Sequence, residues 1–117
     1  MLTIASQTRI FIALYATDMR KGFDGLSGLV SDTLKQDPLS GALFLFVNRR
    51  RDRLKVLYWD GDGLAIWYRR LEQGTFQIPS SNDQLNAIEI RSDEFTMLLR
   101  GIDLSSVKRR KRFQLAS

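Results

Sequence analysis

The 117-residue sequence contains no histidine and no cysteine. Without histidine the chain lacks the most common general base and the most common transition-metal ligand. Without cysteine it can form no disulfide and can carry out no thiol chemistry. No apolar run approaches the roughly 18 residues of a membrane-spanning helix, and the N-terminus lacks the charged-then-apolar pattern of a signal peptide. We therefore expect a soluble cytoplasmic protein with no cofactor, no metal and no membrane contact.

Positive charge is abundant and unevenly distributed along the chain. The formal net charge is +5, and three clusters contain 12 of the 18 basic residues. The acidic residues are scattered, so the clusters predict an acidic partner such as a nucleic acid. The three clusters are Arg49, Arg50, Arg51, Arg53 and Lys55; Arg69 and Arg70; and Lys108, Arg109, Arg110, Lys111 and Arg112.

The N-terminal third predicts a strand followed by a helix. Residues 9–16 are apolar at both odd and even positions, which is typical of a strand covered on both faces. Apolar residues then recur at helical spacing over residues 18–35, with Thr17 or Asp18 as N-cap and Pro38 preventing extension far beyond residue 36. Gly22, Gly25 and Gly28 fall inside this helix. They indicate close packing on a sheet or backbone approach to a phosphate.

The middle of the chain predicts three strands joined by two tight turns. The strands cover residues 42–47, 53–59 and 64–71; the first turn contains three consecutive arginines, and the second is Asp-Gly-Asp-Gly. We expect a further short strand at residues 75–78, an edge strand at 86–90 and a short helix with Ser92 as N-cap, closed by Gly101.

These elements predict an α+β fold with one long helix and a short C-terminal helix. The helices would pack on a mixed or mostly antiparallel sheet with a central three-strand meander. Residues 1–104 would form a single globular domain, and residues 105–117 a basic, flexible tail.

The placement of the two tryptophans depends on the register of the second hairpin. A three-residue turn would pair Trp59 with Ala65 and Leu57 with Trp67, and would put both tryptophans on one face beside Lys55 and Arg69. Such a face would be an aromatic and basic platform for nucleic-acid bases. A two- or four-residue turn would put the tryptophans on opposite faces, because a one-residue slip inverts every side chain.

Only one group of carboxylates deserves a test as a metal site. Asp60 and Asp62 flank a glycine in a turn, where aspartate is common for conformational reasons, and Glu72 follows the far end of the next strand. Two-metal nucleases need several carboxylates within a few ångströms of one another. We therefore predict no catalytic and no metal-binding residue, and keep a metal-dependent nuclease as the third hypothesis.

Several separated segments resemble one family of bacterial proteins. The segments are FLFVNRRRDRLKVLYWDGDGLAIWYRRLEQGTF at 44–76, DMRKGFDGLSGLV at 18–30, DPLSG at 37–41 and, faintly, LLRGIDL at 98–104. Together they resemble the small accessory, TnpB-like protein encoded by the second open reading frame of insertion sequences of the sixty-six family. The residues that match its motifs are Asp18, Arg20, Lys21, Trp59, Asp60, Gly63 and Glu72.

The resemblance implies a helper of transposition encoded beside a separate transposase, and it supplies no catalytic role. Asp18, Arg20 and Lys21 would lie at a helix N-terminus, where they bind an anion or cap the helix. Together with the basic clusters, this predicts a non-catalytic protein that binds DNA at the element ends and assists the transposase. The alternative is a protein–protein adaptor for the transposase that makes no DNA contact. In the first hypothesis all three basic clusters contact nucleic acid, the arginines of the first turn foremost.

Overall fold

The computed structural model describes residues 4, 5, 7–79 and 85–101. Along these residues the elements are β1 (Ile10–Ala13), α1 (Phe23–Asp32), β2 (Leu43–Val47), β3 (Arg53–Trp59), β4 (Leu64–Arg70), β5 (Ala87–Ile90) and α2 (Ser92–Leu99). The predicted α+β class is confirmed. No helix of the described residues is long and apolar enough to cross a membrane. The predicted tail, residues 105–117, lies outside the described residues.

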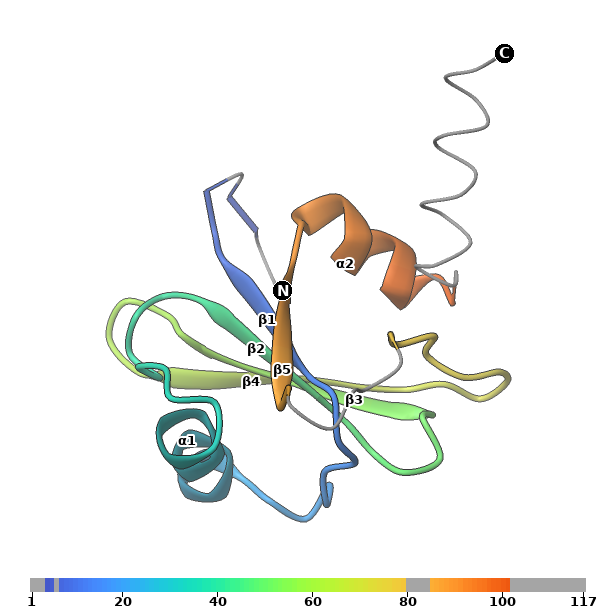
Figure 1. The fold of residues 1–117 in the computed structure, drawn as a ribbon, viewed down its shortest axis with the longest axis horizontal. Coiled ribbons are helices and arrows are strands. Elements are labelled where there is room, and N and C mark those ends of the chain that lie inside the picture. The colour runs from blue at the N-terminus through green and yellow to red at the C-terminus, as the bar shows by residue number, and fades with distance from the viewer. Residues whose placement is uncertain (1–3, 6, 80–84, 102–117) are drawn as a thin grey trace.

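The five strands form one mixed sheet in the order β4-β3-β2-β1-β5 (Figure 1). β1 is parallel to β2, with α1 as the connection between them, and the other neighbouring pairs are antiparallel. The prediction of a sheet built around a central three-strand meander is not matched. β2, β3 and β4 form one side of the sheet, and β1 and β5 continue it beyond β2. Figure 1 shows a strongly twisted sheet with α1 and α2 on opposite sides.

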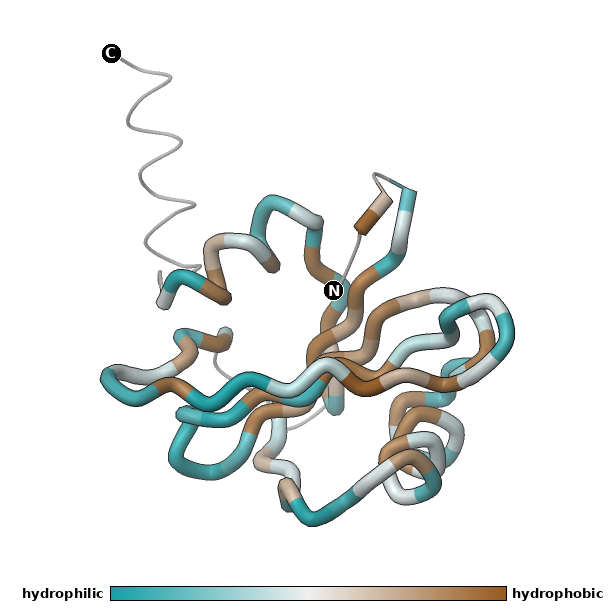
Figure 2. Tube along the Cα trace, turned by 180° about the vertical axis from the view of Figure 1, so that it is seen from behind, coloured by the Kyte–Doolittle hydropathy of each residue, from teal (hydrophilic) through white to brown (hydrophobic). Residues whose placement is uncertain are grey.

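Each face of the sheet buries its own apolar core. Leu26 and Val30 of α1 pack against Phe44 and Phe46 on one face. On the opposite face Phe95 and Leu98 of α2 pack with a core that includes Leu45, Leu54, Val56 and Phe76. The split follows from the period of two along each strand, and it explains why β2 is buried at all five positions. Figure 2 shows hydrophobic colour concentrated on the central strands and hydrophilic colour on the loops.

Helix α1 is shorter than predicted. It spans 10 residues, Phe23–Asp32, rather than 18–35. Residues 18–21 form a turn instead, in which the N–H of Lys21 donates to the carbonyl of Asp18 at 3.1 Å. At the other end Lys35 adopts a positive φ of 55°, and the N–H of Gln36 reaches back to the carbonyl of Val30. This left-handed residue ends the helix before Pro38 can act.

Other boundaries differ by smaller amounts. β1 is shorter than the predicted 9–16 but is buried at every position, as expected for an internal strand. No strand forms at residues 75–78, because Phe76 turns into the core and its N–H donates to the carbonyl of Arg51 at 2.7 Å. The edge strand near residues 86–90 is confirmed as β5. Arg91, not Ser92, is the N-cap of α2, and Gly101 follows the helix with φ of 76°.

The second hairpin has a four-residue turn, residues 60–63, which fixes the tryptophans on opposite faces. Trp59 pairs with Leu64, and Trp67 pairs with Val56. Trp67 packs against the core on the α2 side, whereas Leu57 and Leu64, which share the face of Trp59, pack on the α1 side. The one-faced aromatic platform, which required a three-residue turn, is therefore excluded.

The glycines of α1 provide a test of how this helix packs. A Cβ built on Gly28 meets no atom within 4 Å, so close packing does not require glycine there. We expect Gly28→Ala to raise the free energy of unfolding by about 0.5–1 kcal/mol, since alanine is the better helix former.

Gly61, in the turn between β3 and β4, serves as a contrast because its φ is 83°. Gly61→Ala should lower the free energy of unfolding by about 1 kcal/mol. Urea denaturation measures both, and a destabilised Gly28→Ala variant would contradict this packing.

Candidate nucleic-acid interface

The arginine-rich turn between β2 and β3 is held in one conformation by Asn48. The Asn48 carbonyl accepts the N–H of Arg51 at 3.0 Å. Its side-chain oxygen accepts the N–H groups of Asp52 and Arg53 at 3.1 and 3.0 Å, and its side-chain amide donates to Asp52 at 2.7 Å. Arg51 takes the left-handed conformation, φ 61°. The turn is thus built by its own polar residues, and Arg49 and Arg50 remain exposed on it.

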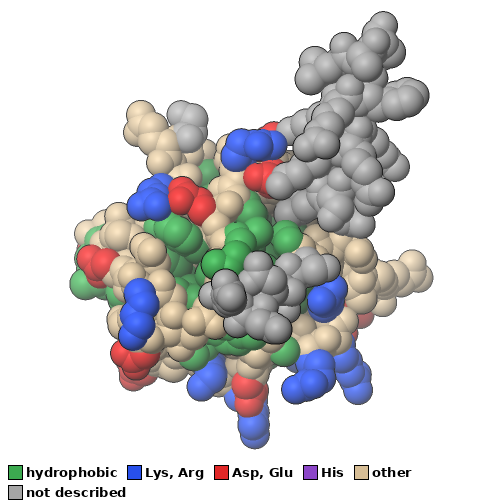
Figure 3. Space-filling view, in the orientation of Figure 1, with side chains coloured by type: hydrophobic (Ala, Val, Ile, Leu, Met, Phe, Trp, Pro, Cys, Tyr) green, Lys and Arg blue, Asp and Glu red, His purple; other side chains and the backbone are tan. Residues whose placement is uncertain are grey.

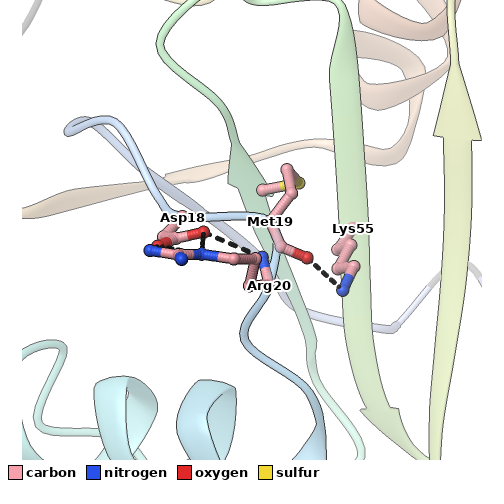
Figure 4. Close-up of polar contacts among 4 residues, drawn as sticks. All are labelled: Asp18, Met19, Arg20 and Lys55. Carbon is pink, nitrogen blue, oxygen red and sulfur yellow. Dashed lines mark hydrogen bonds and ion pairs between the residues drawn. The ribbon is translucent and has the colours of Figure 1, made fainter.

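The segment between β1 and α1 forms a second ordered turn, shown in Figure 4. The Asp18 carboxylate accepts the backbone N–H of Arg20 at 2.9 Å and pairs with the Arg20 guanidinium at 2.7 Å. These hydrogen bonds from Arg20 lower the pKa of Asp18 to about 2. Because protonation of the carboxylate breaks the pair, its support of the turn is present at neutral pH and is lost as the pH falls toward 2.

Lys55 of β3 fastens this second turn to the sheet. Its side chain is buried, at 9% exposure for the residue. The ammonium donates to the carbonyl of Met19 at 2.7 Å (Figure 4) and to that of Lys21 at 2.9 Å. It also lies 4.9 Å from the centre of the Tyr68 ring. In a helix beginning at residue 18 the same carbonyls would accept the N–H groups of residues 23 and 25. The lysine therefore explains why α1 begins late.

An open cleft of about 360 Å³ lies between the two turns. Its floor includes Thr17, which is buried and whose hydroxyl has no hydrogen-bond partner among the described residues. The cleft therefore brings residues of the DMRKG motif next to residues of the arginine turn, about thirty positions later in the chain. The lining residues are Thr17, Asp18, Met19, Asn48, Arg49, Arg50, Asp52 and Arg53.

Basic side chains continue from this cleft onto β4. Arg53 lines both the first cleft and a neighbouring one of about 340 Å³, which Tyr68, Arg70 and Glu72 complete. The Arg53 guanidinium donates to the Tyr68 hydroxyl at 3.3 Å, and Arg53 pairs with Arg70 in the sheet register. Figure 3 shows Lys and Arg side chains gathered along its lower edge, near the two turns. We call Arg20, Arg49, Arg50, Arg53 and Arg70 the arginine surface.

The other predicted basic residues differ in their relation to this surface. Lys55 faces two carbonyls rather than solvent. Arg51 is exposed, while its carbonyl holds Phe76. Arg69 lies on the opposite face of the sheet from Arg70, with its guanidinium 4.9 Å from the centre of the Trp67 ring. The cluster Lys108 to Arg112 lies outside the described residues.

The three acidic residues considered as a metal site are not brought together. Asp60 and Asp62 are exposed in the turn before β4, where the Gly63 carbonyl accepts the N–H of Asp60 at 2.8 Å. Glu72 follows the other end of the seven-residue strand and pairs with Arg70 at 2.8 Å. Among the residues that the structure describes, no three acidic side chains are grouped closely enough to hold a metal ion.

Five residues of the site were not predicted to belong to it: Thr17, Met19, Asn48, Asp52 and Tyr68. Asn48 and Asp52 bracket the three arginines, and this spacing of polar turn residues was the available signal. The place of Tyr68 in the site could not be predicted without the register of the second hairpin. Thr17 carries no signal in the sequence, because its place in the cleft follows from the course of the loop over β3.

Fold and surface together define a small α+β protein with an ordered basic cleft. The chain belongs to the family described as IS66 Orf2 like protein, whose model matches residues 8–109, and membership implies an accessory role in transposition. The chain is 39% identical over 102 residues to "Uncharacterized protein y4jC" of Sinorhizobium fredii (87% of this chain, 86% of the relative). It is 41% identical over 103 residues to "Uncharacterized protein y4hO" of the same strain (88% of each chain). No solved structure matches.

The anchoring role of Lys55 can be tested by substitution. Lys55→Met keeps the apolar stem and removes the ammonium, leaving two carbonyls without their charged donor. We expect the free energy of unfolding to fall by about 2 kcal/mol, with faster amide hydrogen exchange over residues 19–22. Arg50→Met, a matched change at an exposed position, should alter stability by less than about 0.5 kcal/mol. Equal effects of the two substitutions in urea denaturation would contradict the anchoring role.

Proposed function

We propose that this protein is a non-catalytic accessory factor of transposition that binds DNA through the arginine surface and assists a separately encoded transposase. One observation carries the proposal: two ordered turns from distant parts of the chain meet at one cleft lined by Arg49, Arg50 and Arg53. Folding alone gives no reason to gather these like charges. Binding to a polyanion such as DNA would explain why these arginines are grouped.

The geometry suits phosphate binding. Guanidinium groups form paired hydrogen bonds with phosphate oxygens, and Arg49 and Arg50 are exposed on a turn whose backbone is already fixed. A fixed turn loses little conformational entropy when a ligand binds.

The proposed contacts extend beyond the cleft. Arg20 and Lys21 follow Asp18 on the turn between β1 and α1, Arg51 is exposed beside Arg50, and Arg70 continues the surface onto β4. We also assign phosphate contacts to the basic cluster Lys108 to Arg112. Lys55 is left out because its ammonium is already bound within the protein.

The two alternatives make different demands. An adaptor for the transposase would need the same surface to meet a protein, and its binding to DNA would be weak and insensitive to the arginines. A nuclease would need grouped carboxylates, whereas Asp60 and Glu72 lie at opposite ends of β4. Magnesium-dependent cleavage of DNA is therefore not expected.

A salt titration of DNA affinity tests the proposal. Each phosphate contact releases counterions, and log affinity falls against log salt by about 0.9 per contact on duplex DNA. Replacing Arg49, Arg50 and Arg53 by glutamine should flatten that slope by up to about 2.7. The matched control replaces Arg9, Lys35 and Arg100 by glutamine; these residues are exposed and lie outside the cleft. The control variant should keep most of the wild-type salt slope.

Thermal melting of both triple variants shows whether each remains folded. Equal slopes in wild type and the cleft variant would reject DNA binding at this surface. If that variant also lost capture of the transposase, the adaptor would replace the DNA-binding factor as the function.

A further inference from the structure

The outer edge of β4 is long and uncovered by any strand among the described residues. β4 is seven residues long and lies at one end of the sheet, whereas the opposite edge strand β5 has four. Exposed edges of this kind pair readily with other strands unless charge, proline or a bulge prevents it. β5 has such protection, because Glu89 carries a charge and pairs with Arg9. The first five residues of β4, Leu64 to Tyr68, have no charge and no proline.

The hydrogen bonds to β3 determine which backbone groups of β4 face outward. The N–H of Leu71 donates to the carbonyl of Asp52, and the carbonyl of Gly63 accepts from Asp60. Odd-numbered residues of β4 therefore bond to β3, because bonding alternates along an antiparallel strand. The N–H and carbonyl groups of Leu64, Ile66, Tyr68 and Arg70 point to the open edge. Tyr68 also leaves 48% of its surface exposed.

Charge is arranged so that this edge complements itself. The turn before β4 carries Asp60 and Asp62, and the strand ends with Arg69 and Arg70. When two copies of such an edge run antiparallel, the acidic end of each lies beside the basic end of the other. A parallel pairing would set like charges together. The Arg70–Glu72 ion pair is exposed, so it holds Arg70 only weakly against a second acidic partner.

We propose that two copies of this chain pair antiparallel through β4, about a two-fold axis at Trp67. This register uses all four open backbone positions: Leu64 pairs with Arg70 of the second copy, and Ile66 with Tyr68. The exposed Tyr68 ring then covers the half-buried Ile66 of the other chain. The two Trp67 side chains meet on the α2 side at a non-hydrogen-bonded position, where cross-strand aromatic pairs approach most closely. Arg70 lies diagonal to Asp62 of the second copy, and Glu72, which pairs with Arg70 of its own chain, lies opposite that aspartate.

The pairing would join the two sheets into one continuous sheet. A two-fold axis perpendicular to the sheet keeps equivalent faces on the same side, so both α1 helices lie together. Arg53 and Arg70 share the α1 face, and both arginine surfaces would therefore lie on one side of the dimer. This last consequence bears on DNA binding and rests on the proposed function, whereas the pairing itself rests on the edge alone.

Sedimentation velocity of the full chain over a concentration series tests the pairing without DNA. A single strand pair gives a small interface at the weak end of the protein–protein range, so a monomer–dimer equilibrium in the micromolar range is expected. Arg70→Asp places a carboxylate beside Asp62 of the other copy twice per dimer, and it should raise the dissociation constant about tenfold or more. Adding Asp62→Arg to Arg70→Asp restores opposite charges and should return the constant close to that of wild type.

Glu89→Lys reverses a charge on the opposite edge and serves as the matched control, with no expected effect on the equilibrium. The dimer should also show coupled tryptophan circular dichroism that disappears on dilution and in Trp67→Phe. Thermal melting confirms that each variant is folded. A wild-type chain that stays monomeric into the high micromolar range would overturn the proposal, as would a dimer that all the β4 variants leave unchanged. A monomer that captures the transposase through this edge would also overturn it, in favour of a strand from that protein.

Discussion

The bond network of the Lys55 ammonium is the constraint on which the site depends. One charged group joins the turn at residues 18–21, the strand β3 and the Tyr68 ring of β4. A buried ammonium is tolerated only when its donors are satisfied, and the loop carbonyls satisfy two of them. Because the carbonyls of Met19 and Lys21 are bonded to Lys55, they do not accept helical N–H groups. Helix α1 therefore begins at Phe23, and the cleft stays open. The position of the Asp18–Arg20 pair beside the arginine turn follows from this anchor.

The two faces of the sheet have different roles: the α2 face buries apolar side chains, and one end of the α1 face carries exposed arginines. On the α2 side, Phe76 and Phe95 complete a core that reaches the arginine turn through the bond between the N–H of Phe76 and the carbonyl of Arg51. On the α1 side, the end of the sheet carries the clefts and their arginines. The repulsion among these arginines is therefore borne by a turn that is bonded on two sides, by Asn48 and by Phe76. A mobile turn would spread the charges apart and lose the cleft.

The apolar runs of the sequence predicted the strands and the α+β class, because burial on one or both faces leaves a direct pattern in the residues. The start of α1 was not predictable from its apolar stripe, since Met19 remains partly buried in the loop and continues the stripe past the true helix start. The same lysine accounts for a second difference. Lys55 follows four arginines and was grouped with them, but its depth beneath the loop depends on a long-range contact.

Adjacent residues in a strand also separate in space. Arg69 and Arg70 form one cluster in the sequence and lie on opposite faces of β4, because side chains alternate. The tryptophan platform depended on a turn length that the Asp-Gly-Asp-Gly sequence left open. Family resemblance identified both motifs that line the cleft, yet their contact appears only in the structure, because the spacing of the motifs does not encode the course of the loop over β3.

The most direct measurement is an amide NMR titration of the protein with a short DNA duplex. The account predicts that the amides of residues 17–21 and 49–53 shift together with one midpoint, because the two turns form one surface. In Lys55→Met the shifts of residues 17–21 should be lost while those of the arginine turn persist at lower affinity. Shifts confined to the arginine turn in the wild type, or centred on α2, would contradict the claim that Lys55 joins the two turns into one DNA-binding site.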